Sequence, residues 1–233
     1  MSDGPGCTNC KGKAGCDDHK SGMFAAIEAG LGRLYPSRTW GVRDDAAGFE
    51  AGISATEGRE LADALADSLD AATIFVPGED GDLCDYIYVL CMGREPCLIH
   101  IRDGGVPIPH ELAGARVSEQ YLRVCLSAVA NMAAVQQVAV DGDATGPAMV
   151  ICERPRAGVY DAPLLPRFRR LVAEIQGRGI VHLDFGDITN PPPDFDPGAY
   201  PARYGGAQPA VANYFFFPQP ATTEVASVVE RLA

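Results

Sequence analysis

The stretch VSEQYLRVCLSAVANMAAVQ, residues 117–136, decides how the rest of this 233-residue chain is interpreted. Its apolar residues follow the pattern of a helix, the strongest such pattern in the chain, and Ser118 is a candidate N-cap. Short β-rich runs precede and follow this stretch. If residues 117–136 form a helix between these runs, strands and helices are expected to alternate along the chain.

Two amphipathic helices are expected before the first strand. The first begins at Ser21 and ends at Pro36, with apolar residues at helical spacing: Met23, Phe24, Ile27, Leu31 and Leu34. The second begins with SATE, residues 54–57, which fits a capping box. In such a box the serine hydroxyl and the glutamate carboxylate each accept a hydrogen bond from a backbone amide. Leu61, Leu65 and Leu69 then form the inner face of the second helix.

The β-rich runs complete the expected fold. Strands are expected within residues 71–78, 137–140, 148–153 and 180–185. The runs 86–92 and 97–103 are separated by GREP, and this arrangement favours a hairpin. Helices are expected at 162–179 and at 222–232. The sequence therefore predicts an α/β fold: a three-layer-like sandwich with a mixed β-sheet.

The composition divides the chain into three parts. Residues 1–20 form a cysteine-rich, candidate metal-binding segment, and residues 21–187 form the α/β core. Residues 188–233 are dense in proline, glycine and aromatic side chains before the last helical pattern. Such a composition favours an irregular aromatic arm, which packs either on the core or on a partner chain.

Charge and hydropathy exclude several classes of partner. The formal net charge is −12, so neither nucleic acid nor an anionic membrane surface is expected to bind. No apolar run is long enough to cross a membrane, and the first residues lack the pattern of a secretory leader. A cytoplasmic location is therefore expected, in which the eight cysteines serve as thiols or metal ligands rather than in disulfides.

The segment GCTNCKGKAGCDDHK, residues 6–20, carries the clearest chemical signal. Cys7, Cys10, Cys16 and His19 follow the spacing Cys-x2-Cys-x5-Cys-x2-His. Thiolate and imidazole are ligands for zinc, and thiolates hold iron–sulfur clusters. All three lysines of the chain, Lys11, Lys13 and Lys20, lie in this segment. Their ammonium groups could offset the charge of a thiolate site or dock a partner.

The identity of the metal depends on the fourth ligand. A [4Fe–4S] cluster normally takes four thiolates, and Cys7, Cys10 and Cys16 would supply three. The fourth would be His19, or a remote cysteine: Cys84 in the acidic loop GEDGDLCDY or Cys97 after a turn. Zinc would instead accept the three cysteines and His19 as a closed tetrahedron. The spacing resembles local iron–sulfur motifs of several redox and cofactor-assembly proteins, which favours the cluster.

These observations lead to three functional hypotheses. The first is an iron–sulfur protein that transfers electrons or serves as an accessory or regulatory subunit of a larger redox system, with a protein partner or as a homo-oligomer. The second is a zinc-stabilised protein–protein interaction module. The third is an enzyme with a pocket around His100, Arg102 and Asp103, which lie at a strand end before Gly-Gly. No nucleotide-binding or hydrolase motif accompanies these residues.

Overall fold

The computed structural model describes residues 16–44, 51–78, 83–90, 96–101, 104–109, 116–143, 148–156, 158–203, 206–216 and 225–230. The helices are α1 (Cys16–Leu34), α3 (Ala55–Leu69), α4 (Leu165–Gly177), α5 (Phe185–Ile188), α6 (Tyr200–Arg203) and α7 (Val211–Phe215). The strands are β1 (Thr73–Val76), β2 (Cys84–Leu90), β3 (Pro96–Ile101), β4 (Gly104–Pro109), β5 (Arg116–Ser127), β6 (Met132–Asp143), β7 (Ala148–Pro155), β8 (Val181–Leu183) and β9 (Val225–Glu230).

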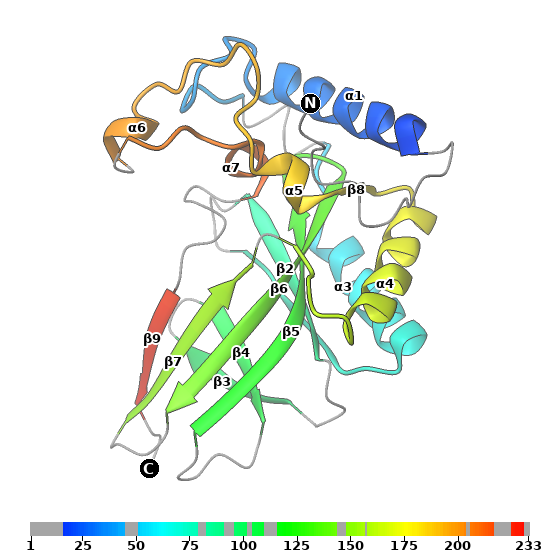
Figure 1. Cartoon of the computed structure of the whole chain (residues 1–233), viewed down its shortest axis with the longest axis vertical. Helices are drawn as coiled ribbons and strands as arrows, with labels where there is room; N and C mark the ends of the chain where they lie inside the picture. The colour runs from blue at the N-terminus through cyan, green and yellow to red at the C-terminus, as the bar shows by residue number, and fades with distance from the viewer. Residues whose placement is uncertain are drawn as a thin grey trace.

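One curved sheet forms the centre of the molecule (Figure 1). Its strand order is β1-β2-β5-β6-β7-β9, and β8 pairs with β6. The neighbours in that order run antiparallel, whereas β8 runs parallel to β6. The predicted α/β class and the mixed sheet are therefore confirmed.

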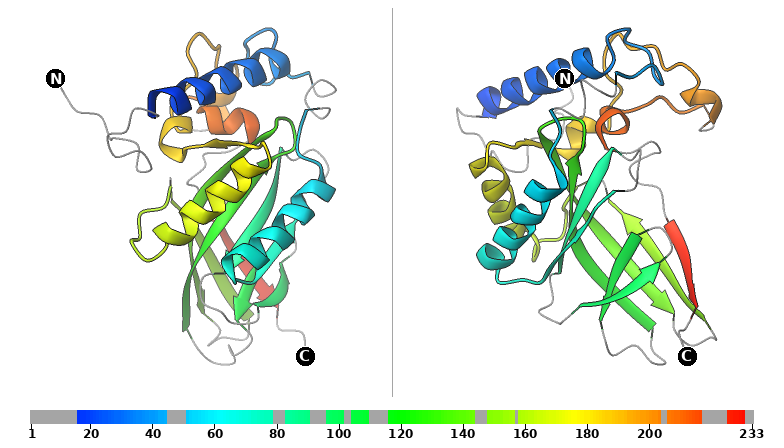
Figure 2. Two further views of the ribbon diagram at one scale, coloured as in Figure 1. Left: turned by 90° about the vertical axis from the view of Figure 1, so that its right-hand side faces the viewer. Right: turned by 180° about the vertical axis from the view of Figure 1, so that it is seen from behind.

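The strands β3 and β4 form a separate two-stranded sheet. This hairpin lies at the end of the molecule away from α1, on the side of the curved sheet that α3 and α4 leave uncovered (Figure 2). It reaches both edges of the main sheet, since β4 contacts β1 and β3 contacts β9. The hairpin therefore contacts both edge strands of the main sheet.

Two hydrophobic cores lie on the two faces of the main sheet. On one face, α3 and α4 pack on alternate residues of the central strands, among them Leu122, Val124 and Leu126. On the other face, α1, α5 and α7 pack over one end of the sheet, around Cys84 and Cys125. Among the described residues, helices therefore cover both faces at that end of the sheet, and the hairpin lies on the side of the second face.

Residues 117–136 do not form the predicted helix. They form most of the long antiparallel pair β5–β6, which is connected through Ala128–Asn131. Both faces of this pair are covered along much of its length, so side chains on both faces are buried. A strand buried on both faces has a nearly continuous apolar sequence, which resembles that of a buried helix.

Two further predictions are wrong. Residues 86–92 and 97–103 do not pair with each other: β2 pairs with β1 and β5, and β3 pairs with β4. The helix expected at 222–232 is also wrong where the structure describes this range, because Val225–Glu230 is strand β9 at the edge of the main sheet. Three of its six residues are valine, and β-branched side chains favour strands.

Three predicted helices are confirmed. In α3 the Ser54 hydroxyl accepts from the Glu57 amide, while the Glu57 carboxylate accepts from the Ser54 amide, as the capping box requires. α4 lies within its expected range. α1 begins at Cys16, five residues before the predicted start, and one member of its expected apolar face, Phe24, is 50% exposed.

The aromatic arm packs on its own chain where the structure describes it. Tyr200, Tyr214, Phe215 and Phe216 are buried, and Trp40 meets Tyr200 and Tyr214 edge to face. The Ser127 hydroxyl on β5 donates to the carbonyl oxygen of Phe215 at 2.9 Å. Tyr204 and Phe217, also expected in the arm, lie outside the described residues.

Candidate functional site

The structure places half of the predicted local ligand set at the start of α1. Cys7 and Cys10 lie outside the described residues. Cys16 is the first residue of α1, and His19 follows three residues later in the same helix. Positions three apart lie on the same side of a helix, so the helix geometry is compatible with one metal ion binding at both positions.

Cys84, a candidate remote ligand, lies in the hydrophobic core rather than in an acidic loop. It is the first residue of β2 and is 1% exposed, in the cluster that also contains Met23 and Ile27 of α1. Its thiol donates to the carbonyl oxygen of Asp85 at 3.1 Å. Burial and the neighbouring Cys125 raise the pKa of the Cys84 thiol well above its ordinary value. The thiolate form that a metal requires is therefore disfavoured at Cys84.

Two of the other predicted site residues lie in the separate hairpin. Cys97 and His100 belong to β3, whereas Arg102 and Asp103 lie outside the described residues. The hairpin and α1 lie at opposite ends of the molecule (Figure 1). Cys97 is therefore in an element remote from the start of α1. The described residues contain no group of three or more His, Cys, Asp or Glu side chains that could hold a metal ion.

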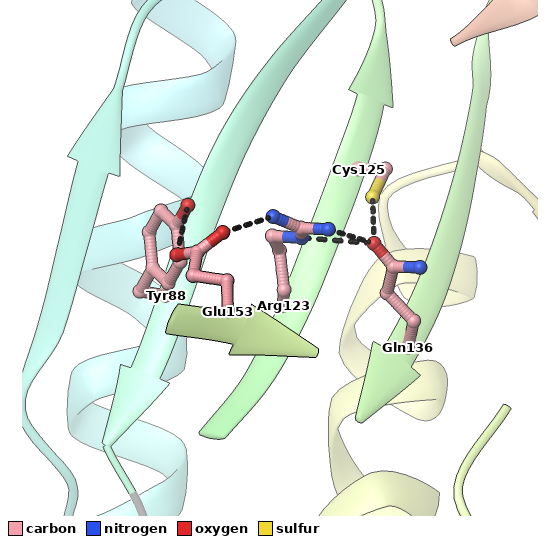
Figure 3. Close-up of polar contacts among 5 residues, drawn as sticks. All are labelled: Tyr88, Arg123, Cys125, Gln136 and Glu153. Carbon is pink, nitrogen blue, oxygen red and sulfur yellow. Dashed lines mark hydrogen bonds and ion pairs between the residues drawn. The ribbon is translucent and has the colours of Figure 1, made fainter. Parts of the chain in front are cut away.

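A second candidate site, which the sequence interpretation missed, is a buried polar network on the face of the main sheet opposite α3 and α4 (Figure 3). Its centre is Arg123 of β5, which is 8% exposed. The direct cross-strand neighbours of Arg123 are Tyr88 on β2 and Gln136 on β6. Glu153 of β7 completes the network and is also buried.

Hydrogen bonds connect these side chains into one continuous network. The Arg123 Nη1 donates to Glu153 Oε2 at 3.1 Å, and Nε and Nη2 donate to Gln136 Oε1 at 2.8 and 2.5 Å. The Tyr88 hydroxyl donates to Glu153 Oε1 at 3.4 Å, and the Cys125 thiol contacts Gln136 Oε1 at 3.6 Å. Arg123 and Glu153 thus form a buried ion pair whose members also bind neutral polar groups.

The electrostatics of the network keep the arginine charged and the tyrosines protonated. Burial by itself lowers the pKa of Arg123, but Tyr88, Cys125 and Glu153 more than offset it, so the net direction is upward. Burial and the charge of Glu153 raise the pKa of Tyr88. The guanidinium also lies over the ring of Tyr86, 5.3 Å from its centre. The network therefore holds a buried ion pair and neutral phenols.

The alternation of residues along β5 was the signal that could have revealed this network. Leu122, Val124 and Leu126 face α3 and α4, whereas Arg123 and Cys125 face the opposite side. Strict alternation of apolar and polar residues indicates a strand. An arginine placed among buried residues of that strand would then have suggested a buried ion pair.

Comparison with known proteins assigns no family to the chain: no protein-family model, curated protein or solved structure matches it. No helix in the described ranges is both long and apolar enough to cross a membrane. The functional argument therefore depends on the residues themselves.

Proposed function

We propose that this protein binds a [4Fe–4S] cluster through Cys7, Cys10 and Cys16, with His19 as the fourth ligand. The spacing of the four residues supports this, since three cysteines and a histidine fall within 13 positions. The observation that carries the proposal is the start of α1 at Cys16, which puts Cys16 and His19 on one side of a helix at the end of the cysteine segment.

The choice of His19 follows from the positions of the remote cysteines. A thiol ligand must be ionised when it binds iron. Cys84 is buried under α1 with a raised pKa, so recruiting it would require opening the core. Cys97 lies in the hairpin at the other end of the molecule. A set of four ligands within residues 7–19 requires neither an opening of the core nor an approach of the hairpin to α1.

The proposed role is electron transfer, or service as an accessory or regulatory subunit of a larger redox system. The three lysines of the chain surround the proposed ligands, on a protein whose remaining charge is strongly negative. Lysines beside a thiolate site attract an acidic partner protein and favour the ionised thiols. The proposed cluster would therefore lie within a docking surface that differs in charge from the rest of the molecule.

Zinc is the second candidate, and one observation favours it. If the burial of Cys84 leaves His19 as the fourth ligand, the set is Cys3His, which zinc accepts in a closed tetrahedron. The protein would then be an interaction module whose first 20 residues are ordered by the metal. Both candidates use the same residues and differ in the metal.

Anaerobic purification followed by iron, sulfide and zinc analysis distinguishes the candidates. About four iron and four sulfide per chain, with broad visible absorption, is the result that we expect. One zinc per chain without iron would replace the cluster with the zinc module. A chain that takes up neither metal, including after reconstitution with iron and sulfide, would refute both. Cys16→Ala should abolish binding, and Cys152→Ala, a change in β7, is the matched control.

A further inference from the structure

The outward sides of α3 and α4 carry exposed charges of opposite sign. The two helices contact each other and pack side by side on the same face of the main sheet (Figure 2). On α3, an acidic strip consists of Glu60, Asp63 and Asp67, which are exposed and lie on one side of the helix. On α4, a basic strip consists of the exposed Arg169 and Arg170. An acidic strip therefore lies beside a basic strip on one surface of the molecule.

The charges of the two strips have no ion-pair partner within the described part of the chain. The ion pair on α4 joins Arg178 to Glu174 of the same helix, and no described pair links α3 to α4. The helix dipoles also oppose the charges at the ends of the strips. Asp67 lies in the last turn of α3, and Arg167 lies in the first turn of α4. Contact with opposite charge from outside the chain would therefore lower the free energy of both strips.

The arrangement of the two strips is self-complementary. α3 leads into β1 and α4 leads into β8, and these strands run in opposite directions, so the two helices are antiparallel (Figure 2). Consider a two-fold axis that runs parallel to the helices and between them, across the outer side of the face. Rotation about this axis places α3 of one copy over α4 of the other. The acidic strip of each copy then meets the basic strip of its partner, at two equivalent contacts.

We propose that the α3–α4 face binds a second copy of this chain in a two-fold dimer. Charge complementarity selects this occupant, because a partner of a single charge sign would be attracted by one strip and repelled by the other. α3 has 15 residues and α4 has 13, so the two helices present a face of about 20 by 20 Å. Specific interfaces are seldom smaller, and we expect a dissociation constant in the micromolar range. This interface is independent of the proposed metal centre.

Sedimentation equilibrium of the full chain, purified anaerobically, tests the proposal. The mass should rise with concentration from one chain to two, and a chain that stays monomeric up to about 1 mM would overturn the dimer. Asp67→Arg and Arg170→Glu each place like charges at both contacts and should weaken the dimer by roughly tenfold or more. Arg33→Glu, at the exposed end of α1, changes the net charge as Arg170→Glu does and should leave the dimer intact. A dimer that either strip substitution leaves unchanged uses another surface and contradicts the proposal.

A mixture of the two strip variants tests the two-fold geometry. In a mixed pair, the arginine introduced into α3 of one chain meets the glutamate introduced into α4 of the other, and the second contact keeps its native charges. The mixture should therefore regain the dimer that each variant alone has lost, and a mixture that stays monomeric would refute the arrangement. Neither substitution opposes the dipole of its helix, so both variants should fold, as circular dichroism can verify.

A further measurement separates this interface from the cysteine segment. Cys16→Ala, which should abolish metal binding, should still form the dimer because Cys16 lies at the start of α1 rather than on the α3–α4 face. A dimer that is lost in Cys16→Ala would assign the association to the cysteine segment and overturn the proposal. A dimer that persists without metal supports the α3–α4 interface whether or not the proposed cluster is confirmed.

Discussion

Removing one member of the buried ion pair should destabilise the protein severely. Glu153→Leu leaves the Arg123 guanidinium buried without its carboxylate and deprives the Tyr88 hydroxyl of its acceptor. Both side chains of the pair are 9% exposed, so water cannot replace the lost partner. Loss of one partner of such a pair costs about 3–5 kcal/mol. Domains are stable by only about 5–15 kcal/mol in total, so the variant should be marginally folded.

Urea unfolding followed by circular dichroism measures this effect, and two further variants control it. Glu174→Gln removes an exposed pair on α4, in which Arg178 and Glu174 are 36% and 32% exposed, and should cost less than about 1 kcal/mol. The double variant Arg123→Met/Glu153→Leu removes both charges and should regain most of the lost stability. A Glu153→Leu variant no less stable than Glu174→Gln would refute the ion pair as described.

Two smaller perturbations test the local geometry of the fold. Ser54→Ala should cost about 1 kcal/mol at neutral pH, measured by urea unfolding. Hydrogen bonds from Ser54 hold the pKa of Glu57 below its ordinary 4.5. The loss of stability in Ser54→Ala should therefore be complete above pH 4.5 and should shrink as the pH falls below that value. A loss of stability that grows on acidification would contradict the capping box. Gly52→Ala should cost about 1–3 kcal/mol, because a new Cβ would clash with the backbone of Ala128. Gly32→Ala, on an open face of α1, should instead stabilise the folded protein by about 0.5–1 kcal/mol. Equal effects of the two glycine variants on stability would contradict the close approach of Gly52 to the backbone of Ala128.

Local signals in the sequence predicted the helices that have one buried face and one solvent-exposed face. The capping box at Ser54 and the leucines at positions 61, 65 and 69 place α3 correctly, because both signals act within one or two turns of the chain. The same applies to α4, where apolar residues recur at helical spacing. Such helices have one apolar face and one solvated face, and this difference shows in the sequence.

The central strands could not be predicted in the same way. Ala133, Ala134 and Met132 are individually favourable in helices, yet they lie in β6, covered from both faces. Tertiary burial, which no local pattern reports, decides the conformation there. Within this stretch, residues 121–127 alternate between the apolar residues of one face and the more polar residues of the other. Recognising that alternation would have predicted a strand in place of the helix and would have revealed the network around Arg123.

The candidate metal ligands show a similar division. The spacing of Cys7, Cys10, Cys16 and His19 is visible in the sequence, whereas the burial of Cys84 is not. A cysteine next to an acidic turn looks exposed when only its neighbours along the chain are considered. The packing of α1 over the start of β2 buries it, and that packing joins residues far apart in the sequence.

The metal content of two matched cysteine variants tests the central claim most directly. Cys16→Ala and Cys84→Ala each remove one thiol and would be purified anaerobically beside the unmodified protein. The local ligand set predicts that Cys16→Ala loses the metal, while Cys84→Ala retains the full amount with reduced stability, since its buried thiol is replaced by a smaller side chain. Loss of metal from Cys84→Ala with retention by Cys16→Ala would contradict the proposed centre.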